Sequence, residues 1–179
     1  MDVRFVPLDL ARVDVLRYEA VALPFFEDER PLRGAAGLCD WRLCGRLSKL
    51  LQGGRVTGEA GEVTLIPARP RLPFDKMLLV GCGGSDGFGE ARYRATLARL
   101  FEVVEALRLR NLVLALPGRS LGRVTPGDAA RWFLDAAAGV QGVEEAVVLD
   151  EPEAQKLMQP IVEAERRRTR AAREALDAS

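Results

Sequence analysis

The segment from Lys76 to Leu109 constrains the fold of this chain more than any other. Met77 to Val80 form an uninterrupted apolar run, typical of a short strand buried on both faces of a parallel sheet. Five glycines follow between positions 81 and 89, and an amphipathic helical pattern runs from Glu90 to about Leu109. The helix N-terminus is therefore expected at the carboxyl end of the strand, where open α/β sheets place their ligands.

The rest of the chain alternates strand and helix patterns around this segment. Further strands are expected at residues 2–8 (the first, at a sheet edge), 18–24, 62–68, 111–117 and 145–150. Further helices are expected at residues 35–52, from Thr125 to Gly139 or Gly142, and from Glu151 onward, with a bend or restart at Pro160. This alternation predicts an α/β fold, a three-layer α/β/α sandwich around a mostly parallel or mixed sheet.

Two units are expected along the chain. Residues 1–150 are predicted to form the α/β domain, and residues 151–179 a charged C-terminal helix that packs on it or docks a partner. Acid and base pairs on this helix are also typical of a solvated helix with a frayed end.

Composition excludes several classes of function. The chain has 26 basic and 26 acidic residues, so no global field favours nucleic acid or anionic lipid. It has no histidine, which excludes Ser-His-Asp and Cys-His mechanisms and zinc sites that need imidazole. Its three cysteines lack C-x-x-C spacing and are interpreted as buried reduced thiols. No apolar run approaches the ~18 residues of a membrane span, and no secretory signal is evident, so a cytoplasmic protein is expected.

Two strand-to-helix loops form the best candidate ligand site. The candidate residues are Gly81, Gly83, Gly84, Ser85 and Gly87 in the first loop, and Gly118, Arg119 and Ser120 in the second. The first loop departs from both phosphate motifs, because Asp86 replaces the third glycine of G-x-G-x-x-G and Asp86-Gly87 replace the Gly-Lys of G-x-x-x-x-G-K. Asp86 would also oppose an anion at a helix N-terminus. A structural turn is therefore favoured, while Arg119 and Arg123 keep an anion or nucleotide pocket as an alternative.

Paired carboxylates occur in two places. They are Glu27-Asp28-Glu29 and Asp150-Glu151. The first group lies in a loop after a strand and offers oxygen ligands for a hard cation. Because Arg30 and Arg33 follow the first group closely, a solvated acidic loop is the favoured interpretation there. No convergent acid and base set emerges, so no catalytic residue, metal ligand or cofactor is predicted.

A longer pattern extends from Tyr18 to Gly83. It consists of Phe26-Glu27-Asp28, Leu32, Gly34, Leu38, Asp40, and the segments 45–51, 58–62 and 78–83. This pattern resembles the N-terminal domain of the leucyl (cytosol) aminopeptidase family, whose fold is related to the macro domain. Leu116-Pro117 and Thr125-Pro126 fit the same domain, so the resemblance covers about residues 1–150. The family's peptidase signature, Asn-Thr-Asp-Ala-Glu-Gly-Arg, belongs to a separate C-terminal domain and is absent here, so no catalytic or metal-binding role carries over.

The resemblance implies a free-standing, non-catalytic module for protein interaction, assembly or regulation, because the N-terminal domain supports hexamer assembly in the full-length enzymes. Expected contact residues are Phe25 and Phe26 beside the acidic loop, and Leu157 and Ile161 on the C-terminal helix. Two alternatives stay open: binding of a nucleotide or ADP-ribose between the two loops, and regulation of a separate leucyl aminopeptidase as a subunit. A protein partner or self-association is expected, without membrane contact, and nucleic acid is disfavoured.

Overall fold

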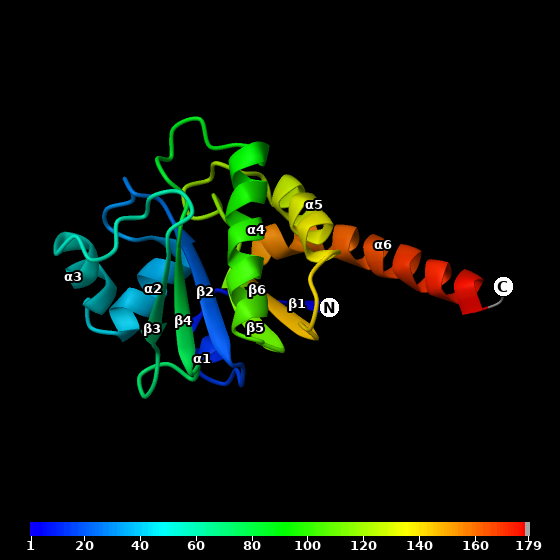
Figure 1. The fold of residues 1–179 in the computed structure, drawn as a ribbon, viewed down its shortest axis with the longest axis horizontal. Helices are drawn as coiled ribbons and strands as arrows, with labels where there is room; N and C mark the ends of the chain where they lie inside the picture. The colour runs from blue at the N-terminus through cyan, green and yellow to red at the C-terminus, as the bar shows by residue number, and fades with distance from the viewer. Residues whose placement is uncertain (178–179) are drawn as a thin grey trace.

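The computed structural model describes residues 1–177, and within them six strands form one mixed sheet (Figure 1). The strands are β1 (Asp2–Pro7), β2 (Ala20–Phe25), β3 (Val63–Pro67), β4 (Lys76–Gly81), β5 (Asn111–Ala115) and β6 (Glu145–Asp150). Their order is β1-β6-β5-β2-β4-β3, and every neighbouring pair is parallel except β3 with β4. β1 lies at one edge, as its sequence predicts, and β2 is buried along its whole length.

Helices cover both faces of the sheet. They are α1 (Leu10–Val13), α2 (Gly34–Arg42), α3 (Arg46–Gln52), α4 (Glu90–Ala106), α5 (Pro126–Ala137) and α6 (Pro152–Asp177). Side chains alternate across each strand, so Leu78 and Val80 of β4 enter the core under α4 to α6, while Met77 and Leu79 enter the core under α2 and α3. The predicted three-layer α/β/α sandwich is therefore confirmed.

The prediction of a single helix at residues 35–52 is wrong, because this segment forms two helices, α2 and α3. Cys44 (φ 55°) and Gly45 (φ 76°) adopt left-handed backbone conformations that end the first helix. The Asp40 carboxylate then accepts a hydrogen bond from the Leu47 N–H (2.7 Å) at the start of α3. One acidic side chain of α2 therefore caps the next helix.

Two smaller expectations also need correction. Residues 9–17, where neither a strand nor a helix is expected, contain α1, whose first turn is capped by the Asp9 carboxylate. The expected restart at Pro160 is wrong, because α6 continues through it, with Met158 and Val162 buried on either side of the proline.

The chain's C-terminal segment is described in part. The side chains of residue 173 and residues 175–177, and all of residues 178–179 of the predicted C-terminal unit, lie outside the description. Among the helices that are described, none is long and apolar enough to cross a bilayer.

Candidate functional site

Three loops meet at the carboxyl ends of the central strands. They follow β2 (residues 26–33), β4 (residues 82–89) and β5 (residues 116–125), and we call them together the strand-end site. The two predicted glycine loops do lie at this same end, since the Arg123 Nη2 lies 3.2 Å from the Ser85 hydroxyl.

The glycines of the site have structural reasons to be glycine. A Cβ at Gly81 would lie 2.0 Å from the carbonyl oxygen of Glu59, so only glycine allows the backbones to approach this closely. Gly118 has a φ of 76°, and a Cβ there would lie 2.8 Å from the Val124 side chain. Gly84 is half-buried and Gly87 is exposed with open space around it. Two of these glycines therefore serve packing, in line with the favoured structural turn.

Arg92, which the sequence did not suggest, holds the first glycine loop together. From the first turns of α4 its guanidinium donates to the carbonyl oxygens of Asp86 (2.9 Å) and Cys82 (2.9 Å), and also to that of Gly84. A Cβ at Gly83 would lie 2.8 Å from the same guanidinium. The carbonyl oxygens of this loop therefore accept hydrogen bonds from the protein's own Arg92 guanidinium.

A carboxylate occupies the donors that an anion would need at this loop, and it belongs to Asp28. The Ser85 N–H donates to Asp28 Oδ1 (2.9 Å), and the Ser85 hydroxyl donates to Asp28 Oδ2 (2.6 Å). The hydroxyl bond, above all, lowers the pKa of Asp28. Asp86, expected to oppose an anion here, is instead 100% exposed, with Arg123 at 3.5 Å.

Glu29 corrects the interpretation of its loop as fully solvated. Its side chain is buried, and the residue is only 2% exposed. It accepts hydrogen bonds from the backbone N–H groups of Phe26 (3.2 Å) and Arg33 (2.9 Å), and from the Ser120 hydroxyl (3.2 Å). Burial raises the pKa of Glu29, although these three donors oppose the shift. Glu29 therefore ties the loop after β2 to the loop after β5.

The expectation that Arg119 supplies free positive charge is also wrong. Its Nε lies 2.8 Å from the Asp150 carboxylate, with the two side chains 16% and 7% exposed, and its Nη1 donates to the Val124 carbonyl (2.7 Å). Asp150 stands at the end of β6. The buried pair neutralises Arg119 and joins the end of β6 to the loop after β5.

A cavity of about 180 Å³ remains between the ends of β2, β5 and β6 and the start of α2. Its lining includes Arg33, Gly34, Arg119, Ser120 and Asp150. The start of α2 has no side-chain cap, so backbone N–H groups face this region. The volume is below the roughly 300 Å³ at which drug-sized ligand pockets begin. The geometry fits a small anion better than a dinucleotide.

Comparison with known proteins places the chain in a family. Residues 22–142 match the family model of the cytosol aminopeptidase family, N-terminal domain. The chain belongs to this family. One relative, the probable cytosol aminopeptidase of Halorhodospira halophila, is 36% identical over 90 residues, which cover 50% of this chain and 18% of that protein. Another, from Haemophilus ducreyi, is 28% identical over 104 residues, 58% of this chain and 21% of that protein. The chain thus spans only a small part of the length of the curated relatives it matches.

Solved structures share the fold of this N-terminal domain. A mutant tomato leucine aminopeptidase superposes with a TM-score of 0.58 at 16% identity, over 89% of this chain and 35% of that one. The Trypanosoma brucei macrodomain in complex with ADP superposes with a TM-score of 0.70 at 15% identity, over 90% of this chain and 69% of that one. The predicted relation to aminopeptidase N-terminal domains and to the macrodomain fold is confirmed.

The predicted partner-binding residues of this domain divide into two groups. Phe25 and Phe26 are core residues, and the Phe26 ring packs edge-on against Phe88 (4.8 Å between centroids), so their assignment to a contact surface is wrong. Ile161 is partly buried against the core beside α5. Leu157 of α6 is 61% exposed and remains available to a partner.

Proposed function

We propose that this chain is a non-catalytic, cytoplasmic docking module for the catalytic domain of a cytosol aminopeptidase, in the same assembly or as a regulatory subunit. The family match supports this role, because it covers the N-terminal domain of enzymes that are several times longer than the matched part. The strand-end site supports it as well, since Asp28, Glu29 and Asp150 already accept the hydrogen bonds that a ligand would need.

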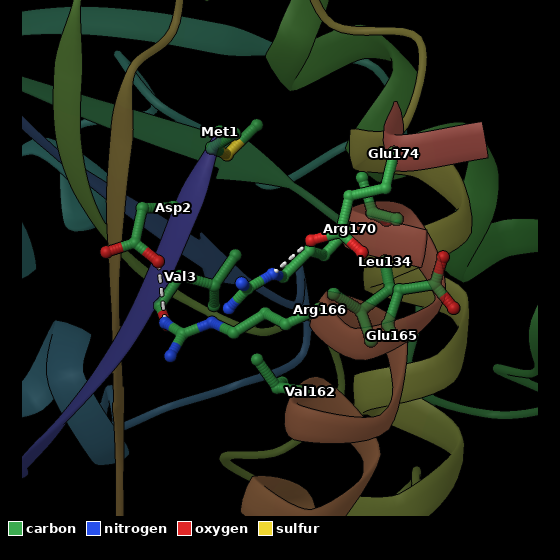
Figure 2. Close-up of a pocket in the computed structure, with 10 residues that line it drawn as sticks. Met1, Asp2, Val3, Leu134, Val162, Glu165, Arg166, Arg170 and Glu174 are labelled. Atoms are coloured by element: carbon green, nitrogen blue, oxygen red, sulfur yellow. Dashed lines mark hydrogen bonds and ion pairs between the residues drawn. The ribbon is translucent and has the colours of Figure 1, made fainter. Parts of the chain in front are cut away.

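The observation that carries the proposal is the geometry of α6. Its first half is anchored on the core, whereas its second half extends away from the sheet (Figure 1). A groove of about 440 Å³ lies between this half, α5 and the first residues of β1. Figure 2 shows Val3, Leu134 and Val162 at its apolar floor, with Arg166 reaching across to Asp2. An apolar floor with a charged rim is the usual anatomy of a protein interface.

Sedimentation velocity tests this proposal. The labelled chain is mixed with the Halorhodospira halophila relative expressed without its matched N-terminal segment, whose folding is checked by its own peptidase activity. We expect a heavier species on mixing, lost in Thr169→Trp, because the exposed Thr169 lines the groove and the larger ring would fill it. The heavier species should be retained in Leu65→Trp, because Leu65 is an exposed leucine on β3 at the opposite sheet edge. Unchanged sedimentation of the mixture, or a heavier species of the chain alone, would reject this partner.

Binding of a nucleotide or ADP-ribose is a second candidate, favoured by the cavity at the start of α2. Arg33, Ser120 and the uncapped helix N-terminus line it, and one fold neighbour is a macrodomain in complex with ADP. A thermal-shift titration of ADP-ribose, ADP and inorganic phosphate tests it. Saturation to 100 times a dissociation constant would stabilise the fold by about 2.7 kcal/mol. A shift with phosphate alone would indicate a small-anion site, and a flat response removes this candidate.

A further inference from the structure

The most exposed aromatic side chain of the described residues lies at the end of α2. Trp41 is 70% exposed, and it is the only aromatic residue among the exposed large apolar side chains of residues 1–177. It lines an open hollow of about 690 Å³ together with Pro31, Leu32, Cys44 and Arg71, and we call this surface the Trp41 hollow. A tryptophan left in water offers a partner a large apolar contact area at little entropic cost.

The backbone beneath the hollow is well fixed. The left-handed Cys44 and Gly45 form a tight turn, and Asp40 locks that turn by capping α3. On the other side, a Cβ at Gly37 would lie 2.5 Å from the Leu32 carbonyl oxygen, so α2 packs directly on the loop before it. The hollow is therefore preformed, and a partner would not have to order it.

Positive charge surrounds the tryptophan. A second hollow of about 370 Å³ adjoins the first through Arg42 and Arg71, and it is also lined by Arg17 and Arg69. Arg42 pairs with Asp14 (2.8 Å), and Arg69 pairs with Asp75 (2.5 Å). The remaining carboxylate of the surface, Asp40, is used as the cap of α3.

Two guanidinium groups of this surface are left without an acidic partner. Within residues 1–177, Arg17 donates only to the backbone carbonyls of Asp14 (3.1 Å) and Leu16 (3.0 Å). Arg71 donates to the Cys44 sulfur (3.1 Å) and forms no ion pair within the part of the chain that the structure describes. Both guanidinium groups lie beside the apolar surface of Trp41 and give this region a net positive charge. A partner segment that carries carboxylates would complement that charge.

We propose that the Trp41 hollow binds an acidic peptide segment of a partner protein, with an apolar side chain on Trp41 and carboxylates at Arg71 and Arg17. A peptide fits better than a nucleic acid, since a single aromatic platform and two free arginines form no repeating track, and the chain as a whole has no net charge. This surface lies on the α2 face of the sheet, opposite α6, so it can fail or succeed independently of the proposed docking of a catalytic domain.

A fluorescence-anisotropy titration tests the proposal with a short labelled peptide of alternating glutamate and leucine. The matched peptide replaces every glutamate with glutamine. We expect saturable binding of the acidic peptide alone, weakened by salt and weakened about tenfold or more in Trp41→Ser. Arg71→Ser should weaken it severalfold. Arg108→Ser is the control, because Arg108 is exposed and lies just after the end of α4, on the other face of the sheet.

Each alternative result is decisive. Equal binding of the glutamine peptide, or an equal loss in Arg108→Ser, would overturn the proposal. Tighter binding of single-stranded oligothymidine than of the acidic peptide would assign the hollow to nucleic acid instead. A dimer seen by light scattering that Trp41→Ser dissolves would assign it to a second copy of this chain. Near-ultraviolet circular dichroism verifies that each variant is folded.

Discussion

The strand-end site and the Trp41 hollow both contain arginines, and the two regions use them in opposite ways. At the strand ends, Arg119 is largely buried and faces the Asp150 carboxylate at 2.8 Å. In the hollow, Arg71 is exposed, and within the described residues its side chain donates only to a cysteine sulfur. The first region pairs Arg119 with its own acidic residue, whereas the second leaves Arg71 and Arg17 without an acidic partner among the described residues.

This difference separates a stabilising role from a binding role. A buried charge without a partner is costly, so the strand-end loops pair the buried Asp150 with Arg119 and surround the buried Glu29 with hydrogen-bond donors. An exposed guanidinium stays solvated at little cost in free energy. Arg71 can therefore remain solvated until an external carboxylate binds it. Substitutions in the first region should therefore change folding, and those in the second should change only binding.

Arg119→Met should cause the largest loss of stability in either region. The substitution leaves the Asp150 carboxylate buried without its partner, which typically costs about 3 kcal/mol in the free energy of unfolding. Urea unfolding measures the loss, and Arg123→Met is the matched control, because Arg123 is 44% exposed and its pair with Asp86 is long. The double variant Arg119→Met with Asp150→Asn should recover part of the loss. A single-variant loss equal to that of the control would show that the pair is not a stabilising element.

Gly81→Ala should cause the second-largest loss, about 2 to 3 kcal/mol in the free energy of unfolding. Its new Cβ would meet backbone atoms of Gly58 and Glu59, which cannot move aside as a flexible side chain would. The control is Gly89→Ala, since a Cβ there meets nothing within 4 Å and Gly89 has an ordinary extended backbone with φ −148°. The two variants are compared by urea unfolding. Equal midpoints would contradict the view that the glycine loop exists for packing.

Much of the fold could be predicted from the sequence because its strands and helices are marked by strong local patterns. The apolar run before Gly81 and the 3.6-residue period after Gly89 are examples, and both elements formed where expected. The break between α2 and α3 was missed for a physical reason. Cys39, Leu43 and Leu47 keep helical spacing across it, while the residue that caps the new helix, Asp40, lies inside the old one.

The strand-end site could be located from the sequence but not interpreted correctly. Asp28 and Glu29 stand in a charged triplet that is typical of a solvated loop. The groups that bind them, Ser85 and Ser120, are 57 and 91 residues away. Only the folded chain brings these partners together, so local patterns carried no signal that the loop would fill the site with its own carboxylates.

Glu29→Gln should lower stability less than the first two variants, by about 1 to 2 kcal/mol in the free energy of unfolding. The amide offers one acceptor oxygen to groups that now donate to two, so at least one buried donor loses its partner. The loss is measured by urea unfolding, with the exposed Glu27→Gln as the control.

The pH dependence of this variant has a definite sign. Because the pKa of Glu29 is raised in the folded state, the native protein binds that proton more tightly than the unfolded chain does. Its contribution to stability therefore increases as the pH falls from the raised pKa toward the ordinary value of about 4.3. The difference in unfolding free energy between wild type and Glu29→Gln should grow over that range. A difference that shrinks as the pH falls would mean that Glu29 is stabilised as the carboxylate.

Arg71→Ser should have the smallest effect on stability, within about 0.5 kcal/mol of wild type. Its side chain is exposed, and the only hydrogen bond that it donates within the described part of the chain is to the sulfur of an exposed cysteine. Urea unfolding run beside Arg119→Met measures both arginines under the same conditions. A loss in Arg71→Ser near that of Arg119→Met would mean that the hollow is part of the folding core. A near-zero loss, combined with weaker binding of the acidic peptide, would establish that the two regions divide stability and recognition between them.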